Sequence, residues 1–117
     1  NYVDDITTAF LKVINNKKSI GKVINIGSNY EISIKDLAKL IIQLTKSNSK
    51  LSFDKKRVRP KLSEVRRLKA NASVAKKIIK WSPMIGGKKG LIDGLKKTID
   101  WYSKNYDFKN KKETYLK

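Results

Sequence analysis

Apolar residues recur at helical spacing near the start of the chain. Between residues 4 and 15 they follow the pattern i, i+3, i+4, i+7, i+8, which predicts an amphipathic helix. Either Asp4 or Asp5 is a candidate N-cap, because a carboxylate accepts hydrogen bonds from the first free backbone N–H groups. The side chains expected to face inward are Ile6, Ala9, Phe10, Val13 and Ile14.

Three further helices are predicted downstream. Residues 33–36 (Ser-Ile-Lys-Asp) have the form of a capping box, with Ser33 as N-cap, and predict a helix to about residue 45. A short helix capped by Ser73 or Asn71 follows and ends at residues 81–83 (Trp-Ser-Pro). The last helix is predicted over 91–105, with Gly90 as N-cap, and Gly94 within it is expected to allow close packing.

Two short runs between the helices are predicted to form strands. They are residues 22–26 (Lys-Val-Ile-Asn-Ile) and 51–53 (Leu-Ser-Phe). The element order is therefore an α/β pattern, mostly helical with a few short strands. Because two short strands make a poor independent sheet, the chain is predicted to be part of a larger unit.

Composition adds a strong basic bias. The 117 residues carry 28 Lys+Arg against 10 Asp+Glu, a net charge of +18. Residues 51–117 hold 20 of the basic and 6 of the acidic groups. Such an excess indicates a polyanionic partner, such as nucleic acid, nucleotide phosphate or an anionic membrane. The alternative is solvated lysine from an AT-rich coding sequence, since Lys outnumbers Arg 24 to 4.

The arginines are concentrated in one place. Arg57, Arg59, Arg66 and Arg67 all lie within eleven residues, and the rest of the chain uses only lysine. A guanidinium pairs bidentately with phosphate or carboxylate, which an ammonium does not do. The cluster therefore predicts an anion-binding site, with a chance grouping around a structural ion pair as the alternative.

Two absences exclude whole classes of chemistry. The sequence has no Cys and no His, which excludes disulfides, thiolate metal sites, Ser-His-Asp triads and most zinc sites. Its longest uninterrupted apolar run is three residues, too short for a transmembrane helix or a signal peptide. We therefore expect no metal site, no membrane partner and a cytoplasmic location.

Several strings match one known family in order and spacing. They are Tyr-Val-Asp-Asp-Ile at 2–6, Val-Ile-Asn-Ile-Gly-Ser at 23–28, Arg-Val-Arg-Pro-Lys-Leu-Ser-Glu-Val at 57–65, Ala-Asn-Ala-Ser-Val-Ala-Lys at 70–76, Trp-Ser-Pro at 81–83 and Gly-Leu-Ile-Asp-Gly-Leu at 90–95. Together they resemble the C-terminal third of extended short-chain dehydrogenases that act on nucleotide sugars, the NAD-dependent epimerase/dehydratase family. Within it, the 57–65 string looks closest to NAD(P)-dependent 4,6-dehydratases of bacterial surface-sugar pathways.

The resemblance implies the C-terminal substrate-binding portion of an extended Rossmann-type enzyme. Residues 1–30 would pack on a missing N-terminal Rossmann domain, residues 31–105 would bind the nucleotide sugar, and residues 106–117 would form a polar tail. The family's Gly-rich cofactor loop and Tyr-x-x-x-Lys catalytic pair have no match in this sequence. The chain alone is therefore expected to hold no catalytic residue and no cofactor, while the full-length enzyme would bind NAD(P).

The same resemblance implies a substrate site. Arg59 matches an arginine that contacts the diphosphate of the nucleotide sugar in related enzymes, and Arg57 is a second candidate. Related enzymes place an acidic residue a few positions later, against the ribose. Here Ser63 and Glu64 are the candidates for the ribose and base side, and Glu64 is shifted from the family position.

Three functions remain open at the level of sequence. The first is the substrate-binding part of a 4,6-dehydratase or epimerase, with a UDP-, GDP- or similar sugar as substrate. The second is a small basic nucleic-acid-binding protein, although no zinc-finger, RNA-recognition or basic-zipper pattern appears. Trp81 and Trp101 are expected to pack in a core or between domains rather than stack on bases. The third is a non-catalytic gene remnant.

Overall fold

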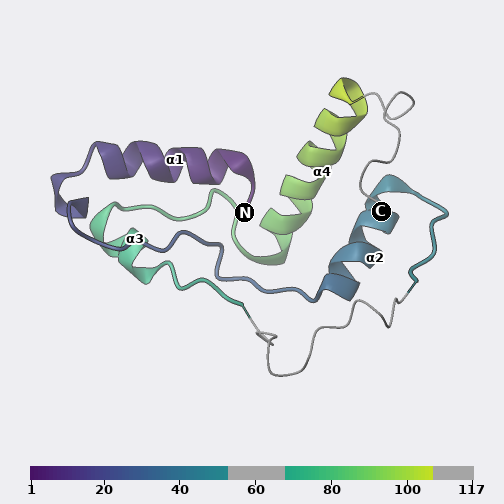
Figure 1. Cartoon of the computed structure of the whole chain (residues 1–117), viewed down its shortest axis with the longest axis horizontal. Coiled ribbons are helices and arrows are strands. Elements are labelled where there is room, and N and C mark those ends of the chain that lie inside the picture. Colours follow the sequence, from purple (N-terminus) through teal and green to yellow (C-terminus); the bar gives the residue numbers. More distant parts are fainter. Residues whose placement is uncertain (53–67, 107–117) are drawn as a thin grey trace, which may run out of the picture.

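A computed structural model describes residues 1–52 and 68–106, and four α-helices and one 3-10 helix lie in these ranges (Figure 1). In chain order the elements are α1 (Val3–Ile14), η1 (Lys17–Ser19), α2 (Ile34–Thr45), α3 (Ser73–Ile78) and α4 (Gly87–Asn105). Figure 1 shows α1 and α3 at one end, joined by extended segments, and α2 beside α4 at the other. The mostly helical expectation is confirmed.

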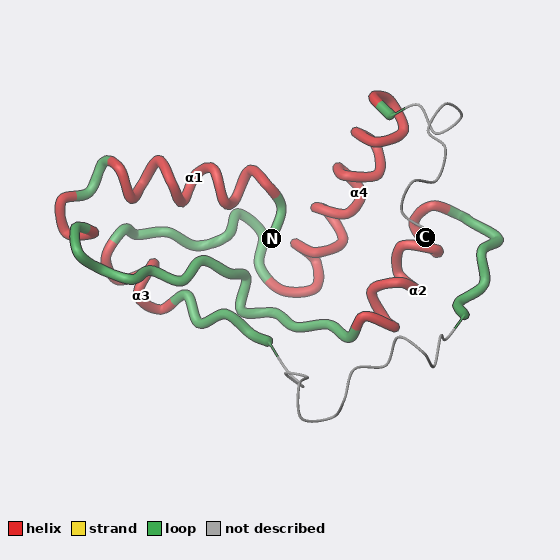
Figure 2. The backbone as a smooth tube through the Cα atoms, in the orientation of Figure 1, coloured by secondary structure: helices red, strands yellow, loops and turns green. Residues whose placement is uncertain are grey.

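The predicted strand at residues 22–26 is not formed. Figure 2 shows no strand in the described part of the chain, and within it the backbone of residues 23–28 makes no backbone hydrogen bond. Burial nevertheless alternates along this segment: Val23 and Asn25 are exposed, while Ile24 and Ile26 are half-buried against the core. A strand needs a neighbouring strand, and the described residues provide none. Residues 51 and 52 are also irregular, and the rest of the second predicted strand lies outside the described residues.

Helix α1 begins without a side-chain cap. Its N-cap is Tyr2, so the prediction of an aspartate cap is wrong. Asp4 and Asp5 lie inside the first turn, where their charges interact favourably with the helix dipole. The carboxylate of Asp5 instead accepts a hydrogen bond from the backbone N–H of Met84 at 2.9 Å, tying the start of α1 to the segment before α4.

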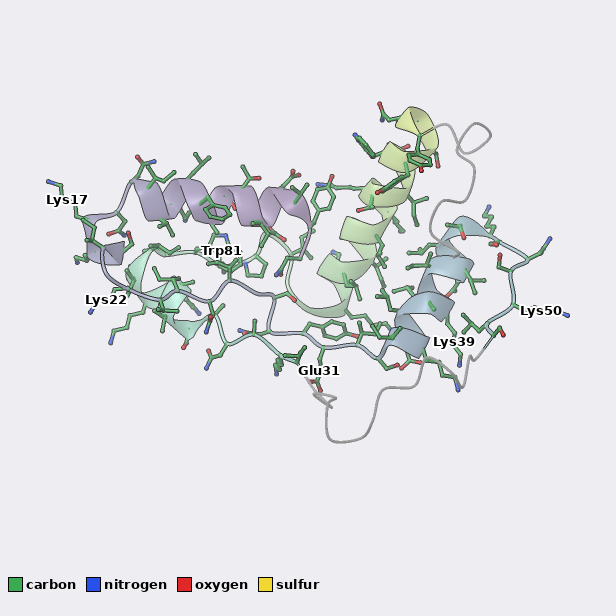
Figure 3. All side chains as sticks on the ribbon, viewed as in Figure 1. Lys17, Lys22, Glu31, Lys39, Lys50 and Trp81 are labelled. Atoms are coloured by element: carbon green, nitrogen blue, oxygen red, sulfur yellow. The ribbon has the colours of Figure 1, made fainter. Side chains whose placement is uncertain are left out.

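The core is small and centred on Trp81, which lies directly below α1 (Figure 3). Its indole N–H donates to the main-chain carbonyl of Asp5 at 3.0 Å. The expected packing role of Trp81 is therefore confirmed. The buried residues of the core are Ala9, Ala72, Ala75, Ile79 and Trp81.

The predicted inner face of α1 is only partly covered, and Ile6 on it is half-buried. Ala9 is buried and Val13 packs against the core, as expected. Phe10 and Ile14, also predicted to face inward, are 65% and 77% exposed. The contact with α3 and Trp81 is too narrow to cover the whole apolar stripe, so one edge of the stripe is left exposed to solvent.

Helix α2 forms as the capping box predicts. The hydroxyl oxygen of Ser33 accepts from the N–H of Asp36 at 3.0 Å, and the hydroxyl donates to the Asp36 carboxylate at 2.6 Å. The helix ends at Lys46, which has a left-handed backbone with φ 52°. Both ends of this helix therefore satisfy backbone groups with local contacts.

The caps of the last two helices differ from the predictions. The N-cap of α3 is Ala72, and the side-chain oxygen of Asn71 accepts from the N–H of Ser73 at 3.0 Å. Helix α4 begins at Gly87, with Gly86 as N-cap, so the predicted start at residue 91 with Gly90 as N-cap is wrong. The first turn of α4 is thus a Gly-rich stretch that sequence propensity alone would exclude from a helix.

Gly94 allows α4 to approach the start of α1, as predicted. A Cβ atom at Gly94 would lie 3.1 Å from the Cβ of Tyr2. Lys97, one turn later, lies 4.9 Å from the centre of the Tyr2 ring and 3.6 Å from the Asp4 carboxylate. By contrast, Trp101 is 56% exposed, so its expected place in a core is not found within the described residues.

Candidate functional site

The four predicted site residues, Arg57, Arg59, Ser63 and Glu64, lie outside the described residues. The structure describes the chain on both sides of them, up to residue 52 after α2 and again from residue 68. Their proposed roles therefore stay predictions. What the structure does define is how the chain is held where it returns to the core.

The returning chain is anchored on the turn that follows residues 22–26. The side-chain oxygen of Asn29 accepts from the N–H of Ala72 at 3.2 Å. Gly27 is buried against Ala70, where a Cβ atom would collide with the alanine side chain. These two contacts fix residues 70–72 beside residues 27–29, although the two segments are more than 40 positions apart in sequence.

Sequence reasoning missed this role of Asn29. The Gly27-Ser28 pair between the predicted strand and the next helix was compatible with a phosphate cradle or, as the preferred interpretation, with a structural connection, and neither interpretation assigned a role to Asn29. Asn29 has a positive φ of 55°, and asparagine is among the few residues that adopt this conformation readily. An asparagine just after a Gly-Ser pair was therefore the available signal for a turn that positions another segment.

A cavity of about 240 Å³ lies beside this anchor, between the start of α1, residues 28–32 and α4. Its wall is mainly apolar and includes Gly90 and Gly94 of α4. The hydroxyl of Thr98 donates to the Gly94 carbonyl at 2.9 Å. Aromatic and polar lining residues include Tyr2, Tyr30, Asp5, Ser28 and Thr98.

The end of the molecule that carries α3 is strongly basic. Residues 6–30 and 68–92 contain ten lysines and no acidic residue. Lys17 and Lys22 mark this end in Figure 3, and Lys76 and Lys77 line a shallow surface hollow with Lys80. The ammonium group of Lys12 donates to the Lys80 carbonyl at 2.7 Å. Part of the positive charge seen in the composition thus lies at this end of the described structure.

Two further kinds of site were sought in the described ranges. No group of three acidic, His or Cys side chains is arranged to hold a metal ion in residues 1–52 and 68–106. Across the same residues, every helix is too short or too polar to cross a lipid bilayer.

Comparison with known proteins identifies the class to which the chain belongs. It is 35% identical over 110 residues to human dTDP-D-glucose 4,6-dehydratase, covering 90% of this chain and 29% of that protein. It is 33% identical over 104 residues to GDP-L-fucose synthase 1 of Arabidopsis thaliana, covering 89% of this chain and 29% of that protein. It is 34% identical over 105 residues to the UDP-N-acetyl-alpha-D-glucosaminuronate decarboxylase of Bacillus cytotoxicus, with 86% and 30% covered.

These relatives are enzymes of nucleotide-sugar metabolism, and the chain matches a C-terminal portion of them. The relatives are of the NAD-dependent epimerase/dehydratase family, and the chain is homologous to that C-terminal portion. It spans less than a third of the length of the curated relatives it matches. No family model and no solved structure matches it. The resemblance found in the sequence is therefore confirmed at the level of the family.

Proposed function

We propose that the chain is the nucleotide-sugar-binding part of an NAD(P)-dependent dehydratase or epimerase. The observation that carries this proposal is the range of substrates named in its relatives, which contain dTDP, GDP and UDP. Their bases and sugars differ, whereas all contain a nucleoside diphosphate. The diphosphate is the part that their ligands share, so a region that these enzymes share is best suited to bind it.

Arg59 and Arg57 are the residues proposed to bind that diphosphate. A guanidinium forms two parallel hydrogen bonds with phosphate oxygens, which suits a diphosphate better than a single ammonium does. The segment that carries them returns to the core at residues 70–72, which Asn29 holds in place. Ser63 and Glu64, nearer to that anchor in sequence, are proposed for the ribose and base side.

Cofactor and catalytic groups are assigned to a part of the enzyme outside this chain. The sequence has neither a Gly-rich cofactor loop nor a Tyr-x-x-x-Lys pair, so its own residues do not fit NAD(P). In a complete 4,6-dehydratase, a cofactor held outside this chain would supply hydride transfer, removing the hydride from the sugar C4 and delivering it to C6 after water is lost across C5–C6. This chain would contribute binding and orientation of the nucleotide. A cytoplasmic role in surface-sugar synthesis is part of the same proposal.

Calorimetric titration of the 117-residue chain with UDP, GDP and dTDP tests this function. Arg59→Ala is expected to weaken binding by about 10- to 100-fold, the usual effect of losing charge-assisted hydrogen bonds. Arg57→Ala is expected to have a smaller effect. Lys61→Ala is the matched control, because it removes one positive charge from the same segment.

The outcome also separates the proposal from nucleic-acid binding. Nucleotide binding that persists in the presence of duplex DNA supports the proposal. If Arg59→Ala and Lys61→Ala weaken binding equally, and both affinities fall steeply with added salt, the site is a non-specific polyanion surface. That result would favour the basic nucleic-acid-binding alternative, for which the lysine-rich end would be the candidate surface.

A further inference from the structure

The hollow beside α3 has the size and the polar groups of a small-ligand site. Its volume is about 490 Å³, and small-molecule sites commonly measure roughly 300–1,000 Å³. Three lysines and two serines line it together with the buried Trp81. The full lining is Ser73, Lys76, Lys77, Lys80, Trp81 and Ser82.

The core fixes the turn that forms one wall of this hollow. Lys80, just after α3, has a left-handed backbone with φ 51°. Two side chains from the α1 end of the chain hold the backbone there. The ammonium group of Lys12 donates to the Lys80 carbonyl at 2.7 Å, and the side-chain amide of Asn16 donates to the Ile78 carbonyl at 2.9 Å. The position of the wall is therefore set by contacts outside the hollow.

The polar groups that line the hollow are available to a ligand. Within the described residues, its three ammonium groups form no ion pair and its two hydroxyl groups form no hydrogen bond. Residues 6–30 and 68–92, which surround it in sequence, contain no carboxylate. Like charges around one hollow repel each other, and an anion that enters it removes that repulsion. The hollow therefore favours an anionic ligand.

We propose that this hollow binds a small ligand that carries a multiply charged phosphate group. A phosphate monoester has about −1.5 to −2 charges at pH 7 and three strong acceptor oxygens. Each lysine supplies three N–H donors, so three lysines and two hydroxyls match such a group. A carboxylate has a single charge and two oxygens, and would leave most of the positive charge unneutralised. The inference does not rest on the proposed function, which assigns a diphosphate to Arg57 and Arg59.

Trp81 connects the hollow to the core and provides a signal for binding. It lines the hollow, is 1% exposed and donates from its indole N–H to the Asp5 carbonyl at 3.0 Å. Figure 3 labels it beneath α1. A phosphate in the hollow is therefore expected to change the fluorescence of Trp81. It should also raise the melting temperature, because a ligand that binds only the folded chain stabilises it.

The test titrates the 117-residue chain carrying Trp101→Phe, in which Trp81 is the only tryptophan. The probe is inorganic pyrophosphate, with acetate at the same ionic strength as the carboxylate comparison. Pyrophosphate is expected to change the Trp81 emission with saturation and to raise the melting temperature, and acetate to do neither. Lys76→Gln with Lys77→Gln should weaken pyrophosphate binding about 10- to 100-fold, because charge-assisted hydrogen bonds are lost.

A matched double variant separates the hollow from the general positive charge. Lys88→Gln with Lys89→Gln removes the same charge from two adjacent exposed lysines in the first turn of α4, which do not line the hollow. It should leave the affinity within about twofold. Circular dichroism checks that both double variants are folded. Since all four lysines are exposed, neither variant removes core packing.

Four results would overturn the inference. The first is a Trp81 emission that pyrophosphate does not change. The second is equal weakening by the two double variants, which would indicate diffuse attraction to the whole surface. The third is a response that Arg59→Ala abolishes and the Lys76 and Lys77 double variant leaves intact. The fourth is duplex DNA that displaces pyrophosphate and binds these lysines more tightly, which would make a nucleic-acid backbone the ligand.

Calorimetric titration of the same samples with UDP keeps the two proposals separate. A Trp81 response to pyrophosphate that depends on Lys76 and Lys77, in a chain that does not bind UDP, supports the inference and contradicts the proposed function alone. UDP binding that depends on Arg59, in a chain whose Trp81 does not respond to pyrophosphate, supports the proposed function and overturns the inference.

Discussion

The indole N–H of Trp81 donates to the main-chain carbonyl of Asp5 at 3.0 Å, across 76 positions of sequence. The Asp5 carboxylate accepts in turn from the N–H of Met84 at 2.9 Å. Together these bonds clamp the first turn of α1 to the segment between α3 and α4. Because Trp81 is only 1% exposed, this clamp is also the centre of the small core.

Replacing Trp81 should therefore cost more stability than any other single change among the described residues. Trp81→Ala is expected to lower the free energy of unfolding by about 3–5 kcal/mol, the usual cost of emptying a large aromatic site. Trp81→Phe should cost less, because it keeps much of the packing and loses the hydrogen bond. Urea denaturation measures both, with Trp101→Phe at a 56% exposed position as the control. A Trp101→Phe effect as large as that of Trp81→Phe would contradict this account.

Gly90 is expected to resist substitution even though alanine favours helices. A Cβ atom at Gly90 would collide with the backbone carbonyl oxygen of Ile85. A backbone atom cannot turn aside as the end of a flexible side chain can. Gly90→Ala should lower the free energy of unfolding by about 1–3 kcal/mol, as overpacking does, in spite of the gain in helix propensity. Lys89→Ala is the control, because Lys89 is exposed in the same turn. Thermal melts that place Gly90→Ala at or above wild type would show that the turn before α4 adjusts freely.

The Ser33 cap should stabilise α2 by a measurable amount. Its hydroxyl oxygen accepts from the N–H of Asp36 at 3.0 Å, so Ser33→Ala leaves that N–H without its partner. The expected loss is about 1 kcal/mol, visible as a lower denaturation midpoint. Ser82→Ala, at an exposed position outside any helix, should have little effect. An equal shift for both variants would mean that α2 is not part of the cooperative unit.

The isolated chain should be marginally stable. Its described core has five buried residues, and one side of α1 is left exposed. A cooperative melt above about 60 °C would contradict this prediction, because it would imply a core comparable to that of an ordinary mesophilic domain. Differential scanning calorimetry at several protein concentrations makes the measurement. Concentration dependence would show whether self-association contributes.

Local signals in the sequence predicted the parts of the fold that depend on local contacts. The span of α2 and its Ser33 cap were predicted correctly, because a capping box joins residues only three positions apart. The close approach at Gly94 was also expected. The start of α4 was predicted wrongly, because the helix begins at Gly87 with Gly86 as N-cap and not at residue 91 with Gly90 as N-cap.

The candidate site, too, could be predicted from the sequence only where it depends on local patterns. The arginine cluster and the family strings were visible without any structure, and comparison with relatives confirmed the family. The turn at Asn29 had a local signal in the sequence, but its partner Ala72 could not be predicted, because it is 43 residues away. No local pattern specifies a hydrogen bond across such a separation.

The sequence by itself determined the helical segments, the concentration of arginine and the family, because these depend on spacing, composition and order along the chain. Only the tertiary structure decided which face of α1 is covered and that residues 22–27 are extended without being a strand. Both depend on a neighbour in space: a side chain is buried only where another surface meets it, and a strand exists only where another strand pairs with it. That is why Phe10 and Ile14, apolar and correctly spaced, lie exposed beside a buried Ala9.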